Sequence, residues 1–212
     1  MLTALWLLTL PVAQAEDISA ILSADHVTWA GLDYSRVSMV SITDFRDPDA
    51  IFPGYLDKWN GLFIVELIDD LSAALGKDVR TDTEGVTAIN QAASPDQIHR
   101  KAADSIWVSS PQLQESDIRA MVSAYDLNVV SGVGLAFQME SLLKEQQQGC
   151  LFVTFFDIAS REVLWSERTC EDVGGFGFRN YYFRPPKSAA LGLKDTVKRW
   201  KKAAKKAARG KW

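Results

Sequence analysis

Histidine and cysteine are scarce in this 212-residue chain, which contains two of each. His26 and His99 lie far apart and have no further histidine or cysteine at the spacing of a zinc site, so we expect no metal there. The chain has no G-x-S-x-G elbow, and Gly132-Val133-Gly134 lacks the third glycine of a phosphate-binding loop. We therefore predict no cofactor and no catalytic residues that a motif would identify. A secreted hydrolase with dispersed catalytic residues stays open as the alternative.

One group of three aspartates has a spacing that can be compared with that of a calcium site. Asp44, Asp47 and Asp49 follow a D-x-x-D-x-D pattern with Pro48 between the last two. Calcium takes several carboxylate oxygens, but the EF-hand loop spaces them differently. Aspartates that cap backbone donors in a solvated turn are far more common. We therefore predict a turn at this position and no metal.

No hydrophobic run reaches the roughly 20 residues that a membrane-spanning helix needs. The apolar run Leu2–Val12 is followed by Ala13-Gln14-Ala15 and then by two acids, which is typical of a signal peptide cut after Ala15. No Lys or Arg precedes the run, so a buried N-terminal helix is the alternative. We expect residues 16–30 to form a linker after the cleavage site.

The only two cysteines stand at the ends of Cys150–Cys170, a segment typical of two β-strands joined by a tight turn. If the turn is centred at Ser160, Asp157 faces Val163 and Cys150 lies opposite Cys170. Opposed residues of an antiparallel pair have Cα atoms about 4.5–5.5 Å apart, within reach of a disulfide, whereas a one-residue slip would separate the sulfurs. We predict the disulfide, with two reduced, buried cysteines as the alternative. Disulfides persist in oxidising compartments, so we expect a periplasmic or secreted protein.

Hydrophobic periodicity predicts the regular elements of the rest of the chain. A β-branched run predicts a strand at Arg36–Phe45, and helical spacing predicts a helix at Tyr55–Leu75 that ends at Gly76. The polar residues 82–110 show no clear element. The other expected elements are a short strand at Asp78–Thr81, a helix at Glu115–Tyr125, a strand at Val129–Leu143 whose end also suits a short helix, the hairpin strands, and a terminal helix at Leu191–Ala208.

This order is β-α-β, a polar excursion, and then α-β-β-β-α. It predicts an α/β fold of the mixed α+β kind, with helices packed on a central sheet that contains an antiparallel meander. The strand at Cys150–Phe156 is apolar on both faces, as expected for the middle of a covered sheet. We predict one domain over residues 31–190, followed by a basic amphipathic helix or tail over residues 191–212.

One short motif within this order resembles a known group of domains. Phe156-Asp157 through Val163-Leu164 is a strand that ends in Asp, a short turn and a second strand. Over residues 36–200 the chain resembles the bacterial envelope domain shared by the curli-secretion lipoprotein, the amino-terminal domain of the Tol-system translocation protein and activators of penicillin-binding proteins. Those families often have Gly where this turn has Arg161. The resemblance implies an assembly or adaptor role in the envelope.

Residues 174–186 combine aromatic, basic and glycine residues, and we expect them to form a loop. Tyr, Phe and Arg anchor many protein interfaces, so this loop is a candidate contact surface for an envelope protein or a glycan. The alternative is that its aromatics fold back onto the core. The segment matches the RNA-binding strand motif only in part, and we predict no nucleic-acid partner. The candidate interface residues are Phe176, Phe178, Arg179, Tyr181, Tyr182 and Arg184.

Charge is distributed unevenly along the chain. Residues 194–212 hold nine basic residues and one acid, Asp195, a net charge of +8, while the other 193 residues, with 14 basic and 26 acidic side chains, carry −12. A basic amphipathic helix can lie on an anionic membrane, with about 1 kcal/mol per basic residue. The alternative is a solvated extension. The candidates for such contact are Lys198, Arg199, Lys201, Lys202, Lys205 and Lys206.

Together these patterns lead us to expect an exported, non-enzymatic binding or assembly module of the bacterial cell envelope. Its expected contact surfaces are the aromatic loop and the basic terminal helix.

Overall fold

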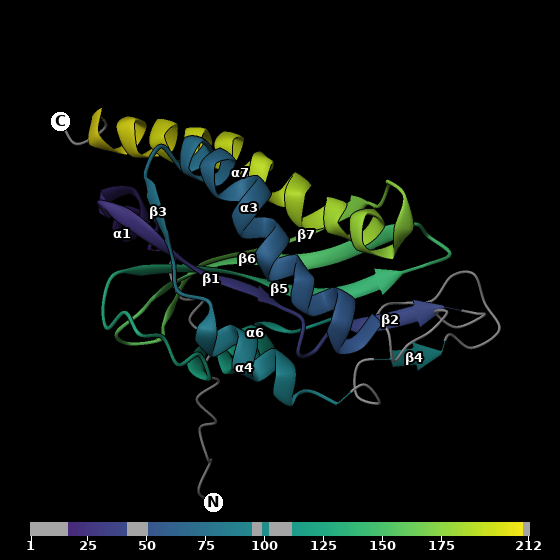
Figure 1. Cartoon of the computed structure of the whole chain (residues 1–212). Helices are drawn as coiled ribbons and strands as arrows, with labels where there is room; N and C mark the ends of the chain where they lie inside the picture. The colour runs from purple at the N-terminus through teal and green to yellow at the C-terminus, as the bar shows by residue number, and fades with distance from the viewer. Residues whose placement is uncertain (1–16, 42–50, 95–98, 102–111, 210–212) are drawn as a thin grey trace, which may run out of the picture.

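The computed structural model of the chain describes residues 17–41, 51–94, 99–101 and 112–209 (Figure 1). The expected signal peptide at 1–15 and the expected aspartate turn at 44–49 lie outside the described residues. The predicted fold class is confirmed, because helices pack on both faces of one mixed sheet.

The elements follow one another in a mixed order of helices and strands. In chain order they are α1 (Ile18–Ser23), β1 (His26–Asp33), β2 (Ser38–Ser41), a short π-helical turn (Ile51–Tyr55), α3 (Leu56–Leu75), β3 (Asp78–Thr81), α4 (Glu84–Ala92), β4 (His99–Lys101), α6 (Glu115–Ser123), β5 (Val133–Leu143), β6 (Gln148–Asp157), β7 (Val163–Asp172) and α7 (Gly177–Arg209).

The seven-stranded sheet is organised around β5, which is buried along its whole length. One edge of β5 pairs in parallel first with β1 and then, further along, with β2. Strands β3 and β4 extend the sheet outward from β1 and β2, also in parallel. The other edge of β5 pairs with β6, and β6 pairs with β7, both antiparallel. The predicted antiparallel meander is therefore confirmed, and it adjoins a parallel half built from the N-terminal strands.

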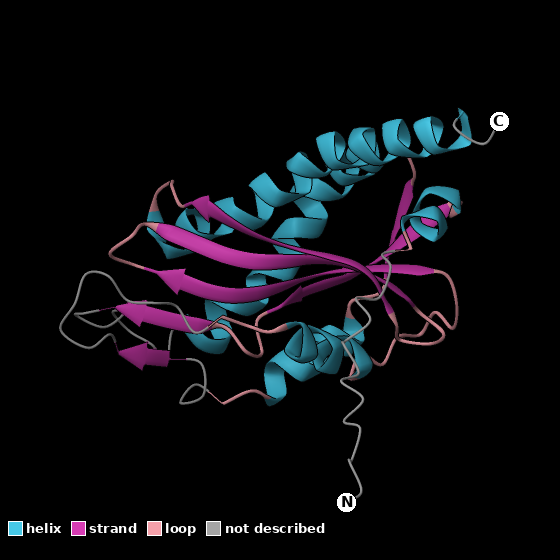
Figure 2. Ribbon diagram, turned by 180° about the vertical axis from the view of Figure 1, so that it is seen from behind, coloured by secondary structure: helices cyan, strands magenta, loops and turns pink. Residues whose placement is uncertain are grey.

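Two helical layers sandwich this sheet. Helices α3 and α7 lie side by side across one face, while α4 and α6 cover the other (Figure 1). Figure 2, seen from behind, shows the long strands of the meander crossing the molecule between the two layers. The carboxyl end of α7 extends past the end of α3 (Figure 1). Helix α7 packs against α3 and against the meander strands β6 and β7.

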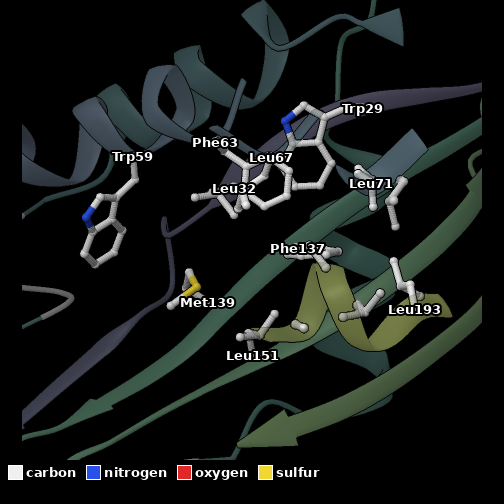
Figure 3. Packing of buried hydrophobic residues seen from close by; sticks show 14 of the residues in the cluster. Trp29, Leu32, Trp59, Phe63, Leu67, Leu71, Phe137, Met139, Leu151 and Leu193 are labelled. Atoms are coloured by element: carbon white, nitrogen blue, oxygen red, sulfur yellow. The ribbon is translucent and has the colours of Figure 1, made fainter. Parts of the chain in front are cut away.

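The main hydrophobic core lies between the sheet and the α3–α7 layer (Figure 3). Trp29 of β1 stacks on Phe63 of α3, with ring centroids 4.1 Å apart and planes 11° apart. Phe137 of β5 meets both rings nearly edge-on. Leu193 and Trp200 of α7 are buried in the same cluster. The inner face of α7 is thus fixed by apolar contacts, which decides which of its side chains point outward.

The linker predicted for residues 16–30 is wrong, because this segment forms α1 and most of β1. Strand β1 lies between β3 and β5, and its residues from Val27 to Asp33 are all buried. A strand covered on both faces has no polar–apolar alternation, so the usual strand signal is missing. Gly31 also makes β1 irregular. It has a positive φ of 122°, and the pairing of β1 with β5 shifts register beside it.

Several other predicted elements agree with the structure. Helix α3 spans Leu56–Leu75 and ends at Gly76 in the left-handed conformation, as predicted, and β3 occupies the predicted residues. The predicted first strand is present as Ser38–Ser41, and its last four predicted residues lie outside the described ones. The polar region after β3 contains α4 and β4. The short helix considered at the end of Val129–Leu143 is wrong, since Leu143 still pairs with Gln148 in the sheet.

The hairpin has the predicted pairing at its open end but not at its turn. Cys150 pairs with Cys170 and forms the predicted disulfide, with Cα atoms 4.0 Å apart. From there to Phe155 and Trp165 the register is as predicted. Phe156 then pairs with Val163, so the predicted pairing of Asp157 with Val163 is wrong. A bulge absorbs one residue of β7 there, and Arg161 turns the chain with a positive φ of 62°.

Candidate functional site

The aromatic segment expected to be a loop is instead the beginning of α7, which starts at Gly177, fourteen residues before the predicted Leu191. Pro185 and Pro186 lie inside this 33-residue helix. Proline has no backbone N–H, so Pro185 leaves the carbonyl of Tyr181 without its usual helical donor. The N–H of Gly174 donates to that carbonyl instead, at 3.1 Å. The helix therefore continues through two prolines that, in sequence, indicate a break.

Most of the aromatic candidates in this segment pack against other residues of the same chain. Phe178 stacks on Trp59, with ring centroids 6.0 Å apart, and also contacts Tyr55. The indole N–H of Trp59 donates to the carbonyl of Arg179 at 3.1 Å. Tyr182 is buried in the main core, and Tyr181 packs against it. These rings therefore fold back onto the core, which was the alternative to an open contact loop.

Replacing Phe178 with Ala should lower the free energy of unfolding by about 2 kcal/mol, below the 3–5 kcal/mol of a fully buried Phe because Phe178 is only half-buried. Phe176, which is 95% exposed, serves as the matched control. Phe176→Ala should change stability by less than about 0.5 kcal/mol. Urea unfolding of both variants measures this, and equal effects of the two substitutions would contradict the described packing.

The outward side of α7 carries a row of basic side chains. Its members are spaced three, four or, across Leu191, seven residues apart and are all exposed, whereas Leu193, Val197 and Trp200 on the opposite side are buried. At 1.5 Å per residue the row is roughly 40 Å long. We call it the basic stripe and define it as Arg184, Lys187, Lys194, Lys198, Lys202, Lys205 and Arg209.

The basic stripe joins two surfaces that were predicted to be separate. Arg184 belonged to the expected aromatic loop, while Lys198, Lys202 and Lys205 belonged to the expected tail. Lys187 and Lys194 were not among the candidates, although their seven- and four-residue steps toward Lys198, both helical spacings, were visible in sequence. The glycines and prolines of the segment indicate a loop, so the helical spacing was not recognised. Only Leu191 and Asp195 interrupt the basic character of the face.

The other tail candidates lie beside the stripe. Lys201 and Lys206 are exposed next to it, on α7. Arg199 faces β7, where its guanidinium lies 4.0 Å from the carboxylate of Glu167 and donates to the hydroxyl of Thr196 at 3.0 Å. Arg199 is therefore directed toward the sheet and away from the stripe.

A groove of about 790 Å³ runs beside the stripe, where α7 passes the end of α3. Ala73, Ala74, Leu75 and Gly76 of α3 form one wall. The other wall belongs to α7 and is lined by Lys194, Asp195, Val197, Lys198, Lys201, Lys202, Lys205, Lys206 and Arg209. The groove therefore combines an apolar wall with seven basic side chains and a single acid.

A chain of buried hydrogen bonds crosses the other half of the molecule. The carboxylate of Asp33 accepts from the Ser35 N–H at 2.9 Å and from the Tyr125 hydroxyl at 2.9 Å. The Tyr125 hydroxyl in turn accepts from the Gln138 amide at 3.1 Å, and the Gln138 carbonyl accepts from Thr154 at 2.8 Å. All of these except Ser35 are buried. The chain ties β1, β5 and β6 to the end of α6, and we assign it a structural role.

Burial raises the pKa of the Asp33 carboxyl above its ordinary 3.8, against the opposing effects of the hydrogen bonds from Ser35 and Tyr125 and of the charge on Arg36. The unfolded chain loses this proton near pH 3.8, while the folded chain keeps it to higher pH. The native state then binds more protons, so this contribution to stability is full at low pH and is lost as pH rises through the folded pKa.

We therefore expect the stability difference between the native chain and the Asp33→Asn variant to shift against the native chain as pH rises from 4 toward neutrality. Urea unfolding over that range measures it. A difference that stays constant or grows in favour of the native chain with rising pH would contradict this assignment.

Other classes of site find little support in the described residues. No group of three His, Cys, Asp or Glu side chains there could hold a metal ion. Within the described part of the chain, no helix has the length and apolar character to cross a membrane. Glu140 is fully buried, but Arg168 binds its carboxylate through two nitrogens and the Leu113 N–H donates to it at 3.0 Å, which makes it part of a structural ion pair. No protein family and no curated protein sequence matches the chain.

Proposed function

We propose that this protein is an exported, non-enzymatic binding module of the bacterial cell envelope that docks on anionic phospholipid through the basic stripe of α7. The observation that carries the proposal is the stripe itself. Seven cations occupy one exposed face, and the opposite face of the same helix is held in the core. A row of like charges on a rigid helix is unfavourable for the isolated protein, and an anionic surface relieves that repulsion.

The strength expected from this contact is moderate. A basic residue near an anionic membrane contributes about 1 kcal/mol. Seven such residues supply at most about 7 kcal/mol, which corresponds to a dissociation constant of roughly 10 µM. Leu191 is the one exposed large apolar side chain on this face, so little of the helix would enter the acyl region. The expected mode is reversible and peripheral.

The rest of the chain supports one orientation on such a surface. Outside residues 194–212 the net charge is −12. An anionic membrane repels this acidic body and attracts α7, so the two effects turn the same face toward the lipid. The disulfide fits a periplasmic or extracellular protein, and the apolar leader followed by Ala13-Gln14-Ala15 supports export by a signal peptide. The resemblance to envelope assembly domains supports the same compartment.

Co-sedimentation with lipid vesicles tests the proposal. The protein should sediment with mixed phosphatidylglycerol–phosphatidylcholine vesicles at low salt and should be released at about 1 M salt, where the screening length falls to about 3 Å. It should stay in solution with pure phosphatidylcholine vesicles. Failure to bind the anionic vesicles at low salt would refute the proposal and would direct attention to an acidic protein or glycan partner.

A further inference from the structure

The groove between α3 and α7 shares Lys194, Lys198, Lys202, Lys205 and Arg209 with the basic stripe and adds an apolar wall to them. Its α3 wall is made of Ala73, Ala74, Leu75 and Gly76, and Val197 of α7 adds a further apolar side chain. The lysines stand along the opposite wall. Ligand sites in proteins commonly have volumes of about 300–1,000 Å³ and are mostly apolar with a few polar groups, so about 790 Å³ is enough for a bound molecule.

The positive charge of the groove exceeds what the protein itself supplies to balance it. The carboxyl end of α3 points into the groove and carries about half a negative charge from the helix dipole. Together with Asp195 it offsets about one and a half of the seven basic charges. Lys77 adds a further cation nearby, and its ammonium group donates to the carbonyl of Leu22 at 2.9 Å. Burial, and next the charge of Lys201, lower the pKa of Lys77.

An inorganic anion would satisfy the lysine ammonium groups but leave exposed Ala73 and the lysine methylene stems that line the groove in contact with water. A neutral hydrocarbon would cover the wall but leave the charges unbalanced. A molecule with both an anionic head and a hydrocarbon chain satisfies both, because burying apolar surface yields about 25 cal/mol per Å² in addition to the ionic contacts.

We infer that the groove binds a single molecule of an anionic phospholipid. Its phosphate lies among Lys198, Lys201 and Lys205, and part of one acyl chain lies along Ala73 and the methylene stems of those lysines. This inference rests on the proposed function and deepens it, since the stripe brings the protein to the lipid surface and the groove then selects one lipid from it. Five of the seven stripe residues also line the groove, so one orientation on the membrane serves both contacts.

Isothermal titration with lysophosphatidylglycerol below its micelle concentration tests the inference on the full chain. Two comparison ligands separate the parts of the site: lysophosphatidylcholine has the chain without the net negative charge, and glycerol phosphate has the anion without the chain. Both should bind more than tenfold more weakly than lysophosphatidylglycerol. Equal binding of either one would overturn the inference.

The decisive variant fills the groove without changing its charge. Ala73 is exposed on α3, so Ala73→Trp should fold normally and should weaken lysophosphatidylglycerol binding more than tenfold. Val65→Trp is the matched control, because Val65 is 85% exposed on the same helix and does not line the groove. Unchanged binding by Ala73→Trp would overturn the inference.

Vesicle binding distinguishes failure of the groove from failure of the proposed function. Ala73→Trp should still sediment with anionic vesicles, because the stripe is intact. If the native chain binds anionic vesicles but not lysophosphatidylglycerol, the groove inference is wrong and the proposed function stands. If it binds neither, both are wrong.

Discussion

Replacing both Cys150 and Cys170 with Ala is expected to lower the free energy of unfolding by about 3 kcal/mol. The disulfide closes a loop with a sequence separation of 20 residues, and in the chain-entropy model a cross-link of this size raises the free energy of the unfolded ensemble by about that much, because it removes conformational entropy. The bond ties the open ends of β6 and β7, and β6 is the strand that joins β7 to the rest of the sheet. Urea unfolding of the native chain and the double variant measures the loss.

A reductant provides the control for this prediction. Treating the native chain with dithiothreitol should reproduce the instability of the double variant, and the same treatment should leave the double variant unchanged. If the native chain has the same unfolding midpoint with and without reductant, the disulfide does not contribute as described.

The largest expected change in binding follows from neutralising the stripe. A variant in which Lys194, Lys198, Lys202 and Lys205 are all replaced with Gln should lose about 4 kcal/mol of affinity for phosphatidylglycerol vesicles. That corresponds to roughly a thousandfold weaker binding. These side chains are exposed, so the melting temperature should change little. Vesicle titration followed by sedimentation measures the affinity.

A second quadruple variant controls for net charge. Replacing Arg36, Lys58, Arg80 and Arg119 with Gln removes the same number of positive charges from positions outside α7. Arg36, Arg80 and Arg119 form surface ion pairs, which contribute little to stability. The control should bind anionic vesicles within a fewfold of the native chain. If both variants lose affinity equally, total charge governs binding and the stripe has no special role.

The elements that could be predicted from the sequence have apolar residues on one face only and a residue such as glycine that ends the element. Helix α3 has apolar residues on one face and a glycine at its end, so its bounds were predicted nearly to the residue. The spacing of the cysteines fixed the open end of the hairpin. Strand β1 escaped prediction because both of its faces are buried, and burial of that kind depends on β3, β5 and the helices that pack on it.

The candidate site was predicted only in part, and for a physical reason. The two prolines and the glycines before them indicate a loop locally, but tertiary contacts override that indication. Trp59 bonds to the backbone of Arg179, and Gly174 satisfies the carbonyl that Pro185 leaves free. Neither contact is visible in the sequence. Once the helix is continuous, Arg184 and Lys187 fall on the same face as the terminal lysines.

Lysine footprinting by mass spectrometry on vesicle-bound protein tests most directly which face meets the membrane. The exposed lysines of the native chain are acylated in solution and again on phosphatidylglycerol vesicles, and the labelling of each is compared. We predict that Lys187, Lys194, Lys198, Lys202 and Lys205 lose reactivity on the vesicles, while Lys58, exposed on α3, keeps it. Loss of labelling at Lys58 with full labelling along α7 would contradict docking through the basic stripe.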